Sequence, residues 1–303
     1  MNKFIPCLLA LLSFYSPGSS QYYFYDADHL EPELRWETGF SFGLMNCLTD
    51  LGGHRGKGQK FIKDLNWKNS QPCLGLFLSA TYRDAFAVRI ESSWGRVTGF
   101  DSVLKNDGSQ AELRYKRNLH FRSRIAEVAA LMEFHPLFLI HLQELPLLSP
   151  YLIAGLAYFN FNPQARLDNN WINLQPLHTE GQGFKEFPER QPYKLKQIGF
   201  PVGIGLRYDV SRFLTTRFEL VYRILRTDYL DDVSRSYIDP IFFRGYFPPA
   251  KAALATRLAD RQQELDPLHT TLAGSPRGDP NDKDAYFSLN LKLSLVLNRK
   301  RYN

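Results

Sequence analysis

The chain lacks the long hydrophobic run that a membrane-spanning helix needs. Its 303 residues are 44% hydrophobic with a mean hydropathy of −0.32. No apolar stretch beyond the N-terminal region is long enough to cross a bilayer, which excludes a helical membrane protein. A transmembrane β-barrel is still compatible with this composition, because barrel strands alternate apolar and polar residues and average to a low hydropathy.

Cysteine is scarce, and concentrated positive charge is missing. The chain has 3 cysteines, and its 37 Lys and Arg residues are spread among 31 Asp and Glu residues. Without a basic stripe or a nucleic-acid motif, the net charge of +6 does not indicate nucleic-acid binding. No His or Cys spacing typical of a metal site occurs, so we expect no metal or other cofactor.

The N-terminus has the three parts of a signal peptide over residues 1–20. Lys3 forms the charged start, PCLLALLSF the apolar segment, and Pro17–Ser20 a cleavage region of small residues. Cys7 precedes most of the apolar run, which argues against a lipoprotein. We therefore expect a mature chain outside the cytoplasm, with one domain over residues 21–303.

The clearest signal is the period of two in the last predicted strand, Ala285–Leu297. Its sequence is AYFSLNLKLSLVL, in which large apolar residues share one parity and polar residues the other. The apolar parity comprises Phe287, Leu289, Leu291, Leu293, Leu295 and Leu297. Such a face suits either a second sheet or lipid, and the strand is long enough to cross a bilayer.

Seven further segments are predicted strands; six of them show the same period, and Tyr151–Phe159 is apolar on both faces. Four of the seven are Leu34–Met45, Cys73–Tyr82, Tyr151–Phe159 and Ile198–Tyr208. The other three are a strand that begins at Phe86, one that ends at Phe134 and one that follows the turn ending at Phe213. Between the eight strands the connections alternate between long and short, which is typical of outer-membrane barrels. The sequence thus predicts an all-β fold, an eight-stranded antiparallel transmembrane β-barrel with long extracellular loops in the outer membrane. The alternative is a soluble lipocalin-like barrel that turns the apolar parity inward around a ligand.

The inward parity of the predicted barrel is charged. It comprises Arg35, Glu37, Arg89, Glu91, Glu127, Glu133, Arg207, Arg217, Glu219, Arg223 and Lys292. An eight-stranded barrel is only wide enough for its own side chains, so we expect a packed network of ion pairs and no pore for solutes. The longest loop, 227–284, also contains a predicted short helix within PPAKAALATRLADRQQEL.

No arrangement of residues indicates catalysis, and we expect no enzyme. A lipid hydrolase would need a serine and a histidine within hydrogen-bond reach. His120 and Ser123 share a predicted strand but differ in parity, so they point apart.

Two loop motifs are explained without a ligand. The cluster Asp228, Asp231, Asp232 and Asp239 has the oxygen ligands of a calcium site, but its spacing does not match an EF-hand. We expect a solvated loop whose carboxylates cap turns. The tripeptide Arg277–Asp279 would suggest adhesion, although chance occurrence in a Gly- and Pro-rich loop is the better interpretation.

The two cysteines of the predicted mature chain, Cys47 and Cys73, lie at the outer ends of neighbouring strands. If their Cα atoms approach within about 4.4–6.8 Å, they can form a disulfide. We predict this disulfide; the alternative is two free thiols.

The connection 135–149 is unusually apolar for a short periplasmic turn. Its sequence, HPLFLIHLQELPLLS, places Leu139, Leu142 and Leu145 among many other apolar residues. Either these side chains enter the membrane edge or they cover a partner. We predict a partner contact on the periplasmic rim.

Several stretches resemble one protein family. They are RNLHFRSRIAEVAALMEF, SPYLIAGLAYFNFNP, WINLQPLHTEGQG, FPVGIGLRYDV, RTDYLDDVSRSY, ALATRLADR and RGDPNDKDAYF, between Arg117 and Phe287. Their order and wording are similar to the PorG-like outer-membrane barrel family of Bacteroidetes, whose founding member belongs to the type IX secretion system. The TDYLDDVS and RG-x-P-x-D-x-D-x-YF stretches are the specific parts.

The resemblance implies a non-catalytic barrel that anchors a periplasmic ring of PorK- and PorN-like proteins to the outer membrane. A rival interpretation is a free-standing structural or adhesive barrel of the OmpA or OmpX kind. Under that interpretation the extracellular loops carry the function.

Overall fold

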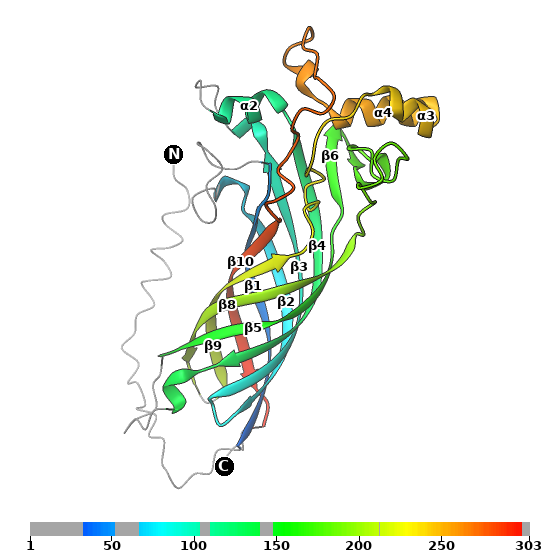
Figure 1. The fold of residues 1–303 in the computed structure, drawn as a ribbon. Coiled ribbons are helices and arrows are strands. Elements are labelled where there is room, and N and C mark those ends of the chain that lie inside the picture. Colours follow the sequence, from blue (N-terminus) through cyan, green and yellow to red (C-terminus); the bar gives the residue numbers. More distant parts are fainter. Residues whose placement is uncertain (1–32, 52–66, 104–109, 140–147, 212, 299–303) are drawn as a thin grey trace, which may run out of the picture.

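The computed structural model describes residues 33–51, 67–103, 110–139, 148–211 and 213–298. Eight of its strands form a barrel: β1 (Leu34–Leu48), β2 (Gln71–Tyr82), β3 (Phe86–Phe100), β4 (His120–Phe134), β5 (Leu148–Asn160), β8 (Lys196–Asp209), β9 (Leu214–Leu225) and β10 (Ala285–Val296). Every neighbouring pair is antiparallel, and pairing of β1 with β10 and of β3 with β4 closes the sheet on itself (Figure 1). The predicted eight-stranded barrel is confirmed.

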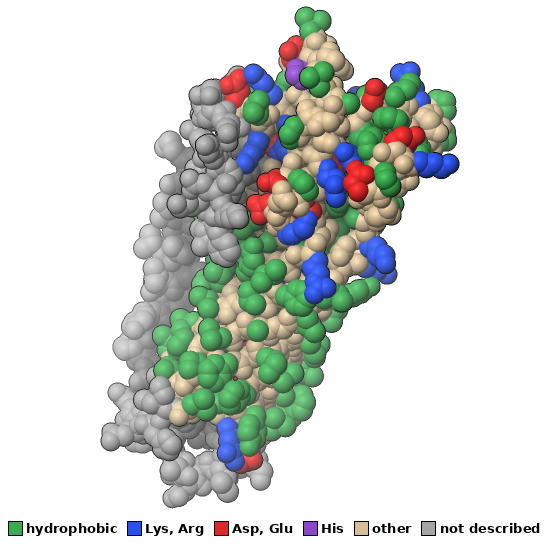
Figure 2. Space-filling model, in the orientation of Figure 1, with side chains coloured by type: hydrophobic (Ala, Val, Ile, Leu, Met, Phe, Trp, Pro, Cys, Tyr) green, Lys and Arg blue, Asp and Glu red, His purple; other side chains and the backbone are tan. Residues whose placement is uncertain are grey.

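The apolar parity of each strand faces outward. On β1, for example, Phe40 and Phe42 are 49% and 42% exposed, and Phe42 pairs in register with Leu291 of β10 and Leu74 of β2. Apolar side chains form a band around the lower half of the molecule (Figure 2). A soluble barrel would bury this parity, so the lipocalin-like alternative is wrong. An apolar outer belt on a closed sheet is the arrangement of a transmembrane barrel of the outer membrane.

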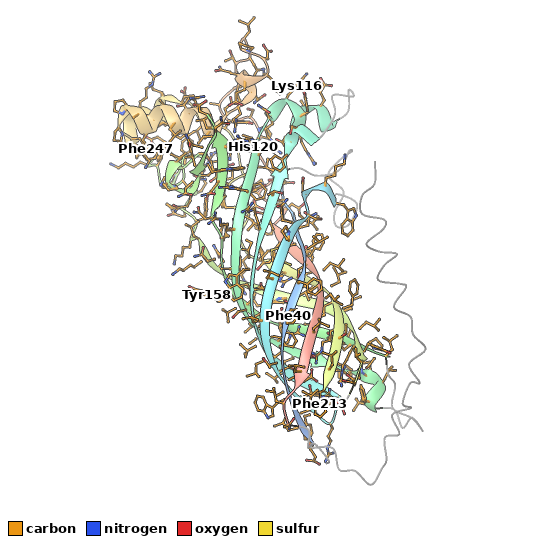
Figure 3. The ribbon with its side chains drawn as sticks, turned by 180° about the vertical axis from the view of Figure 1, so that it is seen from behind. Phe40, Lys116, His120, Tyr158, Phe213 and Phe247 are labelled. Atoms are coloured by element: carbon orange, nitrogen blue, oxygen red, sulfur yellow. The ribbon has the colours of Figure 1, made fainter. Side chains whose placement is uncertain are left out.

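The two ends of the barrel differ in the length of their connections. At one end β2 joins β3 through residues 83–85, β8 joins β9 through residues 210–213, and the short helix η4 (Pro136–Leu139) follows β4. The described chain reaches its C-terminal end on this side (Figure 1). Phe213 lies here, whereas Phe40 and Tyr158 lie on the barrel wall above it (Figure 3). In the outer membrane, short connections face the periplasm.

The other end carries a structured cap, which we define as the described parts of connections 49–70, 101–119, 161–195 and 226–284. Its elements are η2 (Trp67–Asn69), η3 (Asp101–Val103), α2 (Gln110–Arg117), β6 (Pro163–Leu167), β7 (Asn170–Asn173), η5 (Gln175–Leu177), α3 (Ile241–Tyr246), α4 (Pro249–Ala259) and η6 (Gln262–Glu264). The helix that the sequence predicts in the longest loop is present as α4 and is confirmed. The other elements of the cap lie where the sequence predicts only loops. None of the described helices combines the length and apolarity that a membrane crossing requires.

The cap has apolar cores of its own. The helices α3 and α4 pack on β6 and η5 through buried residues that include Phe184, Phe243 and Leu258. A second core, which includes Phe121, Phe159 and Tyr286, joins the cap to the top of the barrel. Burial of such aromatic and aliphatic groups stabilises each by about 1.5–3 kcal/mol. The cap is therefore a folded unit rather than a set of solvated loops.

Inside the barrel wall, a glycine makes room for an aromatic ring. The side chain of Tyr151 on β5 lies against Gly205 on β8, its neighbour in register. A Cβ atom at Gly205 would lie 2.2 Å from Cζ of Tyr151. The ring also stacks on His135, with 4.5 Å between ring centroids, and its hydroxyl donates to Glu219.

Replacing Gly205 should therefore destabilise the barrel. For Gly205→Ala we expect a loss of roughly 1–3 kcal/mol, because the ring must leave its place between β8 and the lumenal network. Denaturant unfolding in detergent, followed by the gel shift between folded and boiled barrel, measures it. Gly245→Ala is the matched control, since nothing lies within 4 Å of a Cβ there. Equal stability of both variants would contradict the packing described here.

Candidate functional site

The first candidate site is the barrel lumen, where all eleven predicted inward charges are buried. Near the periplasmic end Glu37 accepts from Arg217 at 2.6 Å and lies 2.8 Å from Arg35. Arg35 also pairs with Asp84 at 2.7 Å, and Asp84 belongs to the short turn after β2. This turn thus closes the bottom of the lumen with a carboxylate.

The middle of the lumen is organised by Arg89. Its guanidinium donates to both carboxylate oxygens of Glu219, at 2.5 and 2.9 Å, and lies 2.7 Å from Glu133. Lys292 of the last strand lies 3.1 Å from Glu219 and also contacts Glu91. The last strand therefore supplies the cation between two carboxylates.

The upper lumen contains one more pair. Arg223 lies 3.0 Å from Glu127, which also accepts from the hydroxyls of Tyr286 and Ser93. Each described lumenal carboxylate thus has a cation partner, as the sequence predicts. Breaking such a buried pair costs about 3–5 kcal/mol, so these groups serve the structure and fill the space that a solute would need.

The second candidate site is a buried ionic cluster in the cap. Arg277 donates to Glu180 at 3.0 Å and lies 3.7 Å from Asp232. Asp232 accepts from Tyr193 at 2.6 Å and from Thr179 at 2.5 Å. The carboxylate of Glu180 also accepts the backbone N–H groups of residues 234 and 235.

Arg117 ties this cluster to the barrel. It pairs with Asp101 at 2.8 Å and donates to the carbonyl oxygens of Asp50 and Arg277. One guanidinium thus joins the connections that follow β1 and β3 to the one that precedes β10. Sequence analysis missed Arg117 and Glu180, because their partners lie up to 160 residues away.

A group of carboxylates lies beside this cluster. Asp231 and Asp284 accept backbone N–H groups from Leu51, Val233 and Leu230. The prediction of a solvated loop is wrong here, because Asp228, Asp231 and Asp232 are buried and only Asp239 is exposed. They do cap turns, since Asp231 accepts from Val233 and Asp239 accepts from Ile241. Among the described residues no group of three or more His, Cys, Asp and Glu is placed to hold a metal ion.

Burial changes the protonation of these carboxyls. It raises the pKa of Asp50 to about 7, against the hydrogen bond from the backbone of Asp279. It raises the pKa of Asp228 to about 6, against the hydroxyl of Ser234. Burial and the neighbouring carboxylates hold the pKa of Asp231 well above its usual range.

The Arg-Gly-Asp tripeptide is not an adhesive arm. Its Arg277 is 2% exposed and fully engaged in the cap cluster, as described above. Asp279 donates its backbone N–H to Asp50 at 2.9 Å. The arginine is thus part of the cap's core, whereas Asp279 lies at the cap surface and is tied to Asp50 through its backbone.

His120 and Ser123 point in different directions, as expected. His120 accepts the backbone N–H of Arg166, and Ser123 accepts that of Asn162. Neither is placed to activate the other.

The predicted disulfide is absent, and both cysteines are free. Cys73 lies opposite Gly43, whereas Cys47 lies four residues further along β1 and pairs with Tyr286 of β10. Four strand residues span about 13 Å, well beyond the roughly 7 Å that a disulfide tolerates. The error arose because β1 continues to Leu48, three residues past its predicted end, and carries Cys47 away.

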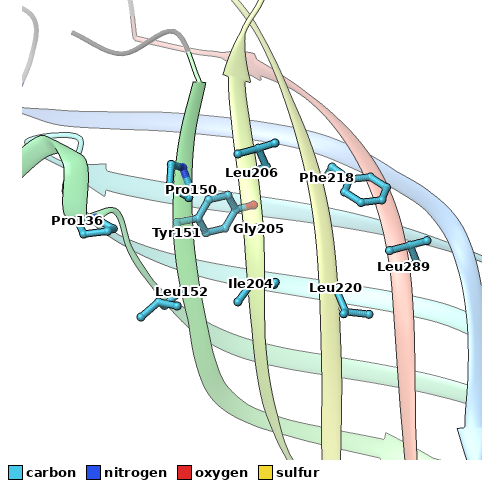
Figure 4. Close-up of a pocket in the computed structure, with 10 residues that line it drawn as sticks. All are labelled: Pro136, Pro150, Tyr151, Leu152, Ile204, Gly205, Leu206, Phe218, Leu220 and Leu289. Carbon is cyan, nitrogen blue, oxygen red and sulfur yellow. The ribbon is translucent and has the colours of Figure 1, made fainter. Parts of the chain in front are cut away.

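The predicted periplasmic contact is described only at its start. Leu139 ends the helix η4 and is 55% exposed. Leu142 and Leu145 lie outside the described residues. Beside η4, an apolar groove of about 440 Å³ runs along the lipid-facing wall across β5, β8 and β9, lined by Pro136, Leu152, Leu206 and Leu220 among others (Figure 4).

The buried carboxyls predict that the cap is more stable at lower pH. Their folded-state pKa values lie above the unfolded value near 3.9, so the native state binds more protons and the free energy of unfolding rises as the pH falls from 8 to 5. We expect a gain on the order of 1 kcal/mol per group, measured by amide hydrogen exchange in residues 226–235.

The variant Asp50→Asn should flatten this pH dependence, because its amide oxygen still accepts from Asp279 while the charge is gone. Asp239→Asn is the matched control, since its carboxylate is exposed and the pH dependence should persist. A cap that loses protection on acidification to pH 5 would refute the assignment.

Comparison with known proteins finds only solved structures of low sequence identity. No protein-family model matches the sequence, and no curated protein matches it. Among solved structures, Neisserial surface protein A has a TM-score of 0.38 and 8% identity, with 87% of this chain and 97% of that chain covered. Ail, the attachment invasion locus protein of Yersinia pestis, has a TM-score of 0.36 and 9% identity, with 88% and 100% covered. Outer Membrane Protein W of E. coli has a TM-score of 0.33 and 11% identity, with 89% and 100% covered.

Proposed function

We propose that this protein is a non-catalytic outer-membrane anchor of a protein-secretion machine of the type IX kind. It would hold a periplasmic ring of PorK- and PorN-like proteins at the membrane. The observation that carries the proposal is the filled lumen. Because paired side chains such as Arg89 and Glu219 occupy the barrel interior, the protein acts through its two ends and not as a conduit.

The cap supports the resemblance on which the secretion role depends. Glu180 belongs to the WINLQPLHTEGQG stretch, Asp232 to RTDYLDDVSRSY and Arg277 to RGDPNDKDAYF. These three residues form one buried cluster although they are up to 97 residues apart. Stretches that share only barrel periodicity would have no reason to meet in a specific ionic core.

The periplasmic end offers a place for the partner. The exposed Leu139 follows Pro136 in η4, beside the apolar groove of the wall. Exposed apolar groups at the rim of a membrane protein favour contact with protein or lipid. Only this end of the barrel can reach a ring beneath the outer membrane.

A second candidate function is a free-standing adhesive barrel of the OmpA or OmpX kind. One observation favours it: Leu268 and Leu272, near the outermost part of the cap, are 92% and 75% exposed. The segment that follows η6, which contains both leucines, is drawn in orange at the top of the molecule in Figure 1. A barrel acting alone would use this tip and would need no periplasmic partner.

Crosslinking in intact cells, followed by purification of the tagged barrel, tests the proposal. We expect co-purification of periplasmic lipoprotein and ring components, and loss of cargo secretion when the gene is deleted. Recovery of the barrel alone, together with normal secretion in the deletion strain, would contradict the secretion role and favour the free-standing barrel.

Leu139→Ser tests the periplasmic contact. We expect a several-fold loss of the co-purified partner with the gel shift of the folded barrel retained, because one exposed apolar contact is removed. Leu268→Ser is the matched control, since it removes an exposed leucine on the opposite side of the membrane. An equal loss of partner in both variants would argue against a contact at η4.

A further inference from the structure

The outer edge of the apolar belt is basic. Moving outward along each barrel strand, the first positions of the outward parity beyond the belt are Asn46, Pro72, Arg96, Arg124, Asn160, Lys196, Arg226 and Ala285, of which Asn46 and Ala285 are covered by the cap. Four of these eight residues are cations and none is an acid. Basic side chains gather just above the apolar band on the face shown in Figure 2. The edge therefore suits an anionic membrane surface.

Two of these cations face each other directly. Arg96 of β3 and Arg124 of β4 are partners in register, immediately beyond the outward pair Trp94 and Ala126. Like charges opposite each other in an antiparallel pair destabilise the sheet. In the described part of the chain no carboxylate pairs with either guanidinium, and Nε of Arg96 is buried without a hydrogen-bond partner.

A third arginine completes the group but is held in place. Arg122 lies one step further out on the same face of β4. It donates to Gln164 at 3.0 Å and stacks 3.8 Å above the ring of Trp171. Both of its partners are neutral, so its charge adds positive potential beside the Arg96 and Arg124 pair.

The pair borders a groove that is polar at one end and apolar at the other. The groove has a volume of about 510 Å³ and is lined by Pro72, Trp94, Arg96, Arg124, Ala126 and Asn160, among others. Its apolar part continues into the lipid-facing wall, where Ile90 and Val128 are 50% and 53% exposed. A ligand that fits this groove has an anionic head and hydrocarbon below it.

We propose that Arg96 and Arg124 bind the phosphate of an anionic lipid in the outer leaflet, whose acyl chains lie along β3 and β4. Two planar guanidinium groups match phosphate oxygens through paired hydrogen bonds, and a bound phosphate removes the repulsion between the two arginines. A lipid also explains the position of the site along the barrel axis, because the two arginines lie immediately beyond the outer edge of the apolar belt, where lipid headgroups begin. A free phosphate ion would leave the apolar part of the groove unused.

The test uses the purified full-length barrel in dodecyl maltoside and diphosphoryl lipid A as the probe. Native mass spectrometry measures bound lipid across a concentration series. For Arg96→Ser/Arg124→Ser we expect at least a tenfold weaker affinity than for the parent protein. Lys185→Ser/Arg244→Ser, which removes the same charge from exposed cap positions, should bind as the parent does. The gel shift on boiling verifies the fold of each variant.

Two further probes identify the ligand. Phosphatidylcholine, which has no net charge, should bind at least tenfold more weakly than lipid A, and inorganic phosphate in tenfold excess should not displace lipid A. Equal binding of the double variant and the parent, equal binding of phosphatidylcholine, or displacement by inorganic phosphate would overturn the proposal. If the double variant does not fold, unchanged lipid A affinity of Arg124→Ser alone would overturn it.

Discussion

The structure depends on charge pairing inside a barrel that is only just wide enough for its own side chains. Eight strands leave room only for side chains, so the inward parity must satisfy its own ionic groups. Arg89 and Glu219 form a two-point pair at the centre, and the ion pairs above and below it use every described lumenal carboxylate. This requirement fixes the register of all eight strands, because a shift of one residue would turn these charges toward lipid.

The barrel was predictable because its signal is repeated and local. A period of two in β10 and the alternation of long and short connections already define strands, facing and membrane orientation. Arg89 could be assigned to the lumen for the same reason. Its particular partners, Glu133 and Glu219, depend on the closed sheet and could not be read from periodicity.

The cap was poorly predictable because its contacts are long-range. The sequence places Asp232 in a predicted solvated loop and Arg277 in a tripeptide attributed to chance. In the structure the two side chains form a buried ion pair. The failed pairing of Cys47 with Cys73 has a similar origin. A strand that extends three residues past its predicted end changes every distance at that end, and no local pattern in the sequence marked this extension.

The position of Lys292 sets the order in which the barrel can be assembled. This lysine lies on the last strand, 201 residues after Glu91, and it is the cation that lies between Glu91 and Glu219. A seven-stranded intermediate would hold both carboxylates beside Arg89 but without Lys292, and with two open edges in the membrane. Arrival of β10 closes the sheet and places Lys292 between these two carboxylates in the same step, so edge closure and completion of the central ion-pair network are coupled.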